Sequence, residues 1–241
     1  MERMIARIGW WLFALAALYT LVGTIGNRIA SHSYIIPLTL EPGHSAQVNV
    51  LRLHPDYVDL ELWHAYAQGQ ERPELGRYSH EERAQGYYVD DPGQPVILQV
   101  STSTESVVYE AGPRTGRGAH TISRGMRPQA PDDDPKLFGG PTQPAPATLP
   151  RGRSTVTFSV LQVGPALRGE RVELHLEPPL GVKSTSASYQ WLWIFFFWPV
   201  IVAGLALWAL GLAYMSWHVR DLPPRIPRSK PGRQEKPGVG R

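Results

Sequence analysis

Two long, uncharged and strongly apolar stretches lie near the two ends of the chain. The first has no charged side chain in the 20 residues between Arg7 and Arg28, and a second uncharged stretch begins at Ser184. Twenty residues of α-helix span about 30 Å, which is the thickness of the hydrocarbon core of a bilayer. We therefore expect two transmembrane helices, at residues 8–29 and 190–217.

Between these stretches, short runs alternate apolar and polar side chains with a period of two. Val58, Leu60 and Leu62, for example, are separated by single acidic residues. This period places one face of a β-strand in a core. Eight strands are predicted, at residues 34–40, 46–53, 58–63, 95–101, 106–110, 119–123, 155–160 and 172–177. Eight short strands with one apolar face favour an antiparallel β-sandwich or a related barrel, so we predict a membrane-anchored, mainly β fold with a β-sandwich-like domain at residues 31–188.

Two segments of the middle region do not follow this alternation. Residues 66–87 are polar and rich in charge, and we expect them to form a long loop or a short surface helix. Residues 128–152 contain seven prolines and three consecutive aspartates. Such a composition buries little apolar surface to offset the entropy of ordering, so a flexible Pro-rich loop is expected there.

The positions of Lys and Arg predict the orientation of the helices. Arg3 and Arg7 flank the first helix. The second helix is followed by a basic tail that includes Arg220, Arg225, Arg228 and Lys230. Because basic residues favour the cytoplasmic side, residues 1–7 and 218–241 are expected there, and residues 31–188 outside the cytoplasm. The alternative of a cleaved signal peptide at the N-terminus is disfavoured, because the apolar stretch exceeds the usual length.

Overall composition hides this division. The mean hydropathy of −0.23 and the net charge of +3 resemble those of an ordinary basic soluble protein. Residues 31–188, however, have a net charge of −4, and residues 218–241 a net charge of +5. The positive charge therefore belongs to a tail suited to anionic lipid headgroups, and nucleic acid is not expected as a partner. The chain has no cysteine, which excludes disulfides and thiol chemistry.

A search for catalytic or metal-binding patterns yields one weak candidate. The seven histidines at positions 32–175 have no ligand spacing, and no serine-nucleophile motif is present. We therefore expect no catalytic residue, no metal and no cofactor. The glycine-rich segment 112–118 contains Arg114 and Arg117, which could contact an anion, a lipid headgroup or an acidic partner surface. The simpler interpretation of this segment is a hairpin or inter-strand loop.

Small and weakly polar residues mark possible packing faces on both helices. In the first helix Ala16, Thr20, Gly23 and Asn27 recur at helical spacing, and the second helix contains Gly204, Ala209, Gly211 and Ala213. Small residues on one face allow another helix to approach closely. The two sets either pack against each other or receive a partner's helix, and the sequence does not choose between these alternatives.

Three classes of function agree with this organisation. The first is a non-enzymatic accessory or scaffold protein of the bacterial inner (plasma) membrane, whose helices pack with a membrane protein or with further copies and whose outer domain binds a partner protein. The second is an immunity protein that neutralises a toxin acting on the membrane or in the periplasm. The third, a membrane-anchored envelope hydrolase, is the least supported because it lacks any motif for chemistry. The bilayer is the one partner common to all three.

Overall fold

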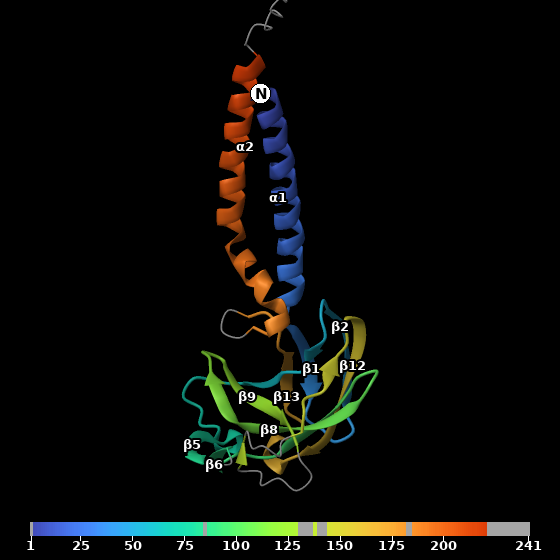
Figure 1. Cartoon of the computed structure of the whole chain (residues 1–241). Coiled ribbons are helices and arrows are strands. Elements are labelled where there is room, and N and C mark those ends of the chain that lie inside the picture. The colour runs from blue at the N-terminus through green and yellow to red at the C-terminus, as the bar shows by residue number, and fades with distance from the viewer. Residues whose placement is uncertain (1, 84–85, 130–136, 139–143, 182–184, 221–241) are drawn as a thin grey trace, which may run out of the picture. The chain divides into compact units, whose positions relative to one another are not determined.

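The structure, a computed structural model, describes residues 2–83, 86–129, 137–138, 144–181 and 185–220 (Figure 1). The chain divides into two compact units. One unit holds Met1–Leu21 and Phe197–Arg241, and the other holds Val22–Phe196. The helices are α1 (Glu2–Ala30), the 3₁₀ segment η3 (Ala187–Phe197) and α2 (Trp198–Arg220).

The larger unit is built on one eight-stranded antiparallel sheet in the order β1-β13-β4-β9-β8-β7-β12-β2. Its strands are β1 (Tyr34–Thr39), β2 (Ser45–Arg52), β4 (Leu60–Ala65), β7 (Val96–Ser101), β8 (Ser106–Arg117), β9 (Thr121–Pro128), β12 (Gly152–Val163) and β13 (Arg171–Leu176). These eight strands correspond to the eight predicted from the alternating pattern. The apolar positions of that pattern, such as Leu62, Phe158 and Leu174, are fully buried in one core.

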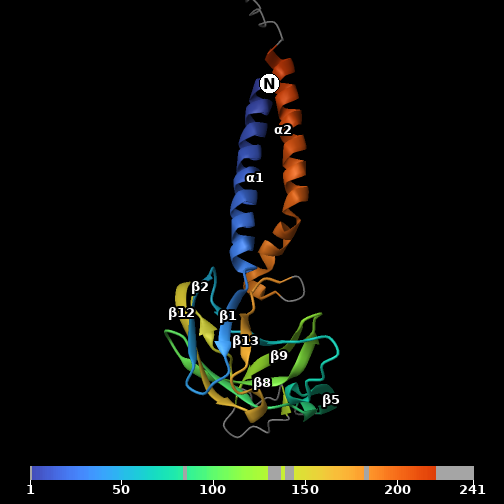
Figure 2. The same cartoon turned by 180° about the vertical axis from the view of Figure 1, so that it is seen from behind.

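The sheet nearly closes on itself, which is closer to the barrel than to the sandwich among the two expected arrangements. Its edge strands β1 and β2 approach each other, and both views show β1, β2 and β12 together (Figures 1 and 2). The main-chain N–H of Leu51 on β2 donates to the hydroxyl of Tyr34 on β1 at 3.0 Å. A period-two pattern specifies one buried face of each strand, and a curled sheet satisfies that requirement as well as a sandwich does.

Two smaller sheets complete the β unit. The first contains β5 (Arg77–Arg83), β6 (Gly86–Asp91) and β10 (Leu137–Phe138), and the second pairs β3 (Asp56–Tyr57) with β11 (Thr148–Leu149). Single turns of 3₁₀ helix occur at η1 (Pro73–Leu75) and η2 (Pro165–Leu167). Residues 66–76 form a loop with one 3₁₀ turn, as expected, but the expectation was wrong from Arg77 onward, where β5 and β6 form a hairpin.

Part of the Pro-rich segment 128–152 also differs from expectation. Ala147 and Leu149 are fully buried in the core. The N–H of Ala147 donates to the hydroxyl of Tyr109 at 2.9 Å, and the carbonyl of Ala147 accepts from the N–H of Val58 at 2.7 Å. The prolines do not prevent this packing, because Pro146 and Pro150 flank the segment that contains Ala147 and Leu149. Residues 130–136 and 139–143 lie outside the described residues.

In the smaller unit, α1 and α2 run antiparallel. Phe13 meets Trp208 edge to face with ring centroids 5.9 Å apart, and the indole N–H of Trp10 donates to the hydroxyl of Ser216 at 3.2 Å. Both helical segments, Met4–Ala30 and Ala187–His218, are long and apolar enough to cross a membrane. The second is 3₁₀ up to Phe197. Pro199 then lies in the first turn of α2, where its missing N–H breaks no helical hydrogen bond.

Candidate functional site

A cavity of about 320 Å³ in the β unit is lined by four arginines. We call it the basic pocket and define it by Tyr66, Arg72, Arg77, Arg114 and Arg117. The rest of its lining is Gly69, Gln70, Glu71, Pro73, Gly76 and Ile122. Its arginines come from the segment after β4, from the start of β5 and from the end of β8.

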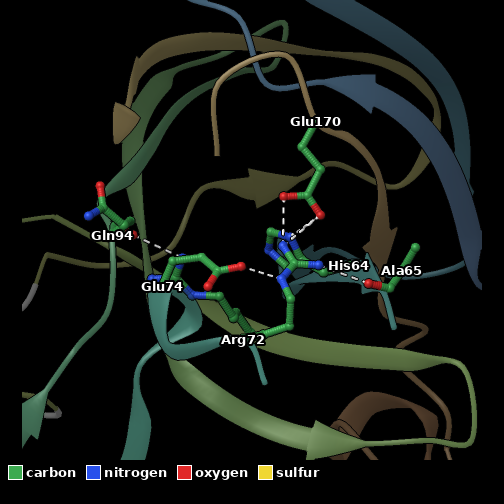
Figure 3. Close-up of polar contacts among 7 residues, drawn as sticks. His64, Ala65, Arg72, Glu74, Gln94 and Glu170 are labelled. Carbon is green, nitrogen blue, oxygen red and sulfur yellow. Dashed lines mark hydrogen bonds and ion pairs between the residues drawn. The ribbon is translucent and has the colours of Figure 1, made fainter. Parts of the chain in front are cut away.

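Arg72 is fixed in this wall by carboxylates (Figure 3). Its Nη2 lies 2.9 Å from each carboxylate oxygen of Glu170, its Nε donates to Glu74, and its Nη1 donates to the carbonyl of Ala65 at 2.9 Å. Hydrogen bonds between charged partners are shorter and stronger than those between neutral groups, so these contacts define the position of the guanidinium group. Arg72 therefore has a structural role in the wall of the pocket, and the carboxylates of Glu170 and Glu74 offset its charge.

His64 lies behind this pair and is completely buried (Figure 3). Its Nδ1 is 3.2 Å from Glu170 Oε1, while its Nε2 has no hydrogen-bond partner among the described residues. Burial lowers the pKa of His64, so the imidazole is neutral and Nδ1–H donates to the carboxylate. Burial alone would raise the pKa of Glu170, but hydrogen bonds from His64 and Arg72 hold that pKa below its usual value.

A second fixed arginine, Arg124 on β9, supports the same region from inside. It is fully buried and donates to four main-chain carbonyls, those of Gly112, Ala111, Gln94 and Pro92, at 2.6–3.2 Å. Burial lowers the pKa of Arg124 to about 10, so the side chain remains charged at neutral pH. These bonds tie the β8–β9 hairpin to the turn between β6 and β7.

A close approach of two glycines forms the adjoining turn, at the start of β5. Gly76 and Gly93 have φ of 77° and 79°, and a Cβ added to Gly76 would lie 2.6 Å from the main-chain N of Gly93. Only glycine combines this backbone conformation with so short a contact. The pair therefore sets the position from which Arg77 extends to the pocket.

Arg114 and Arg117, the pair singled out in the sequence, both line the basic pocket. They lie at the end of strand β8, and the turn itself begins at Gly118, whose N–H donates to the carbonyl of Thr121 at 2.8 Å. The guanidinium carbon of Arg117 is 4.5 Å from the ring centroid of Tyr66, and its Nη2 donates to the Tyr66 hydroxyl. The segment is thus a strand end within a hairpin, which agrees with the simpler interpretation of it, and it also forms part of the pocket wall.

An acidic cavity of about 490 Å³ lies elsewhere in the β unit and includes Asp56, Asp59 and Glu177. Burial raises the pKa of Asp59, and the neighbouring charges of Glu61 and Asp56 raise it further. Burial, Glu61 and Asp59 likewise raise the pKa of Glu177. Within the described ranges, no group of three or more histidines and carboxylates is arranged to hold a metal ion.

The residues predicted to pack on the first helix lie on one face of α1. Thr20, Gly23 and Asn27 are buried and Ala16 is half-buried. A Cβ on Gly23 would lie 2.0 Å from Cζ of Phe195, so this glycine receives the phenylalanine ring of the same chain. The hydroxyl of Thr20 donates to the carbonyl of Ala16 at 2.9 Å, within the helix.

The predicted residues of the second helix do not share one face of α2. Ala209 is half-buried, whereas Gly204, Gly211 and Ala213 are exposed. A Cβ added to Gly204 or Gly211 would meet nothing within 4 Å. At 3.6 residues per turn these two glycines lie on the same flank of the helix, nearly opposite Ala213. In the basic tail, Arg220 is the last residue of α2, and Arg225, Arg228 and Lys230 lie outside the described residues.

Sequence reasoning did not identify Arg72, Arg77 or Arg124. Each is a single arginine in a polar stretch, and nothing near it in the sequence distinguishes it from a solvated surface residue. The partner of Arg72, Glu170, is 98 positions away along the chain. Only the folding of the chain brings these residues together, so this part of the pocket could not be recognised from a local sequence pattern.

Comparison with known proteins gives little further information. No known protein family matches the chain, and no curated protein matches it. Among solved structures, the crystal structure of GEBA250068378 from Sulfurospirillum deleyianum is similar over 61% of this chain and 97% of that chain. The sequence identity is 14% and the TM-score is 0.40, a likeness too distant to assign a fold family or a function.

Proposed function

We propose that this chain is a non-enzymatic accessory or scaffold protein of the bacterial inner membrane. Its helices would pack with a membrane-protein partner, and its β unit would bind a partner protein outside the cytoplasm. The observation that carries the proposal is the exposed apolar surface of helices long enough to span a bilayer, including Trp11 at 73%, Val200 at 71% and Leu207 at 70% exposure. Exposing such a large apolar surface to water is unfavourable in free energy, and contact with lipid or with other helices removes it from water.

The distribution of basic residues supports the orientation with both termini in the cytoplasm. The absence of cysteine allows a direct test, because a single introduced cysteine is the only thiol in the chain. Ser103 is exposed in the turn between β7 and β8, and Ser229 belongs to the basic tail. In intact spheroplasts, a membrane-impermeant maleimide should label Ser103→Cys without lysis and Ser229→Cys only after lysis. Equal labelling of both, or the reverse pattern, would overturn the orientation.

The exposed flank of α2 provides a test for a partner helix. Leucine at Gly204 and Gly211 would extend into open space, so the packing of α2 on α1 should persist. Through a C-terminal tag, the native chain should recover a partner from membranes in mild detergent, and the Gly204→Leu/Gly211→Leu variant should recover less. Ala206→Leu is the matched control, since Ala206 is exposed and lies nearly opposite the two glycines. Recovery of the native chain alone at every detergent strength would count against an accessory role.

A further inference from the structure

We infer that the basic pocket is a docking site for an acidic peptide segment of a partner protein, with Arg77, Arg114 and Arg117 as the groups that contact its carboxylates. This inference rests on the proposed function and names the surface through which the outer domain would bind. Two features carry it: the charge of the pocket and the contacts that hold part of its wall in place.

The charge of the pocket is not balanced at its rim. Arg72 is paired with two carboxylates, those of Glu170 and Glu74, and Glu71 contributes a further carboxylate to the lining. No described carboxylate forms an ion pair with Arg77, Arg114 or Arg117. These three arginines line one cavity, and the four arginines and three carboxylates leave one positive charge in excess within a domain whose net charge, over residues 31–188, is −4. Self-repulsion of this kind is relieved by an anionic ligand.

The walls are held in place before a ligand arrives. Arg117 rests on the ring of Tyr66. The half-buried pair of Arg72 and Glu170 holds Arg72 in the wall. A preorganised set of donors loses less entropy on binding than a set of mobile surface side chains.

The chemistry of the lining favours carboxylates over a free phosphate. Phosphate sites commonly use a cluster of main-chain N–H groups at a helix N-terminus or a glycine-rich turn. Here the donors are arginine side chains at the rim of a small cavity, and η1 has only three residues. Planar guanidinium groups match carboxylates and phosphates alike in a two-point geometry, so it is the use of side-chain rather than main-chain donors that favours Asp and Glu side chains entering from outside.

The test measures binding of a fluorescein-labelled hexaglutamate peptide to the full chain in detergent, by fluorescence anisotropy at low salt. The variants are Arg114→Gln/Arg117→Gln and, in a separate protein, Arg77→Gln, which alters only an exposed rim residue. Arg151→Gln/Arg153→Gln removes two exposed arginines outside the basic pocket and is the matched control. Inorganic pyrophosphate, added to the native chain, tests the small-anion alternative.

We expect the double variant to weaken peptide binding at least tenfold, Arg77→Gln to weaken it severalfold, and the control to bind as the native chain does. Raising the salt concentration should weaken binding of the native chain. Absence of peptide binding, equal binding by all the variants, or tight binding of pyrophosphate without the peptide would each overturn the inference. If the peptide does not bind but the tagged chain still recovers a membrane partner, the docking site fails while the proposed function stands.

Discussion

The side-chain amide of Asn27 donates a hydrogen bond to the main-chain carbonyl of Leu192 at 3.0 Å. Both residues are buried, and they join the end of α1 to the 3₁₀ segment η3. Next to them, Gly23 receives the ring of Phe195, and Gly26 lies against Leu192. Two of the four residues predicted as a packing face on α1 thus contact a segment of their own chain. The exposed glycines of α2 are the better candidates for contact with another protein.

Removing the side-chain amide of Asn27 should weaken the contact between the end of α1 and η3. Asn27→Ala leaves the carbonyl of Leu192 without its donor, and we expect a loss of about 0.5–1.5 kcal/mol, seen as a lower thermal midpoint of the full chain in detergent. Val22→Ala is the control, because Val22 is on α1 and 55% exposed. An unchanged thermal midpoint for Asn27→Ala would show that this hydrogen bond does not stabilise the contact between α1 and η3.

Tyr109 is expected to hold the buried end of the Pro-rich segment in the core. Its hydroxyl donates to the carbonyl of Val58 at 3.1 Å and accepts from the N–H of Ala147, and burial raises the pKa of Tyr109 to about 12. Tyr109→Phe leaves both main-chain groups buried without this partner, which costs about 1–3 kcal/mol. Hydrogen exchange of the Ala147 amide should accelerate tenfold or more, whereas Tyr57→Phe, at an exposed position, should leave it unchanged. Equal exchange in both variants would contradict the role of the hydroxyl.

Arg124 is expected to be among the most sensitive positions of the β unit. Arg124→Met keeps an unbranched side chain but removes the donors to four carbonyls, and we expect a loss of at least 2–4 kcal/mol. Arg114→Met, at the half-exposed register partner, should change stability by less than about 0.5 kcal/mol. The measurement is urea denaturation followed by tryptophan fluorescence. Similar losses of unfolding free energy in the two variants would show that the buried hydrogen bonds of Arg124 do not contribute more to stability than the half-exposed Arg114 does.

The strands of the main sheet could be predicted because burial of one strand face produces a local alternation of apolar and polar residues. The apolar positions around Leu62, Phe158 and Leu174 alternate with polar ones, and all three residues are in the core. The β5–β6 hairpin has no such pattern, since residues 77–91 are polar and charged over much of their length. The curvature that brings β1 beside β2 is a property of the whole sheet, and no single strand encodes it.

The candidate site was predictable only in part, for the same reason. Arg114 and Arg117 are conspicuous because they lie among glycines. Arg72 becomes distinctive only through Glu170, which strand pairing brings to it from far along the chain. Burial of Arg124 could not be anticipated either, because an arginine in a strand is ordinarily solvated and its four acceptors are main-chain carbonyls.

Acid should destabilise the β unit in two stages. Burial holds the pKa of His64 below its usual 6.5, so the unfolded chain takes up a proton there that the folded protein does not. Stability should therefore fall as the pH drops below about 6.5. The lowered pKa of Glu170 contributes stability that is present above its usual value of 4.5 and is lost as the pH falls through the lower folded value. The raised pKa values of Asp59 and Glu177 act in the opposite direction, because these groups bind protons more readily in the folded chain. The contribution of His64 is therefore expected as a difference between the pH profiles of the native chain and a His64 variant.

Substitution of the histidine separates the two stages. His64→Gln removes the buried imidazole, so the fall between pH 7 and pH 5 should become shallower while the fall at lower pH remains. His44→Gln, at an exposed position in the turn between β1 and β2, should reproduce the native profile. The measurement is the thermal midpoint of each full chain in detergent at half-unit pH steps. A His64→Gln profile that falls as steeply as the native profile between pH 7 and pH 5 would contradict the coupling, because His64 is expected to bind more protons in the unfolded chain than in the folded one.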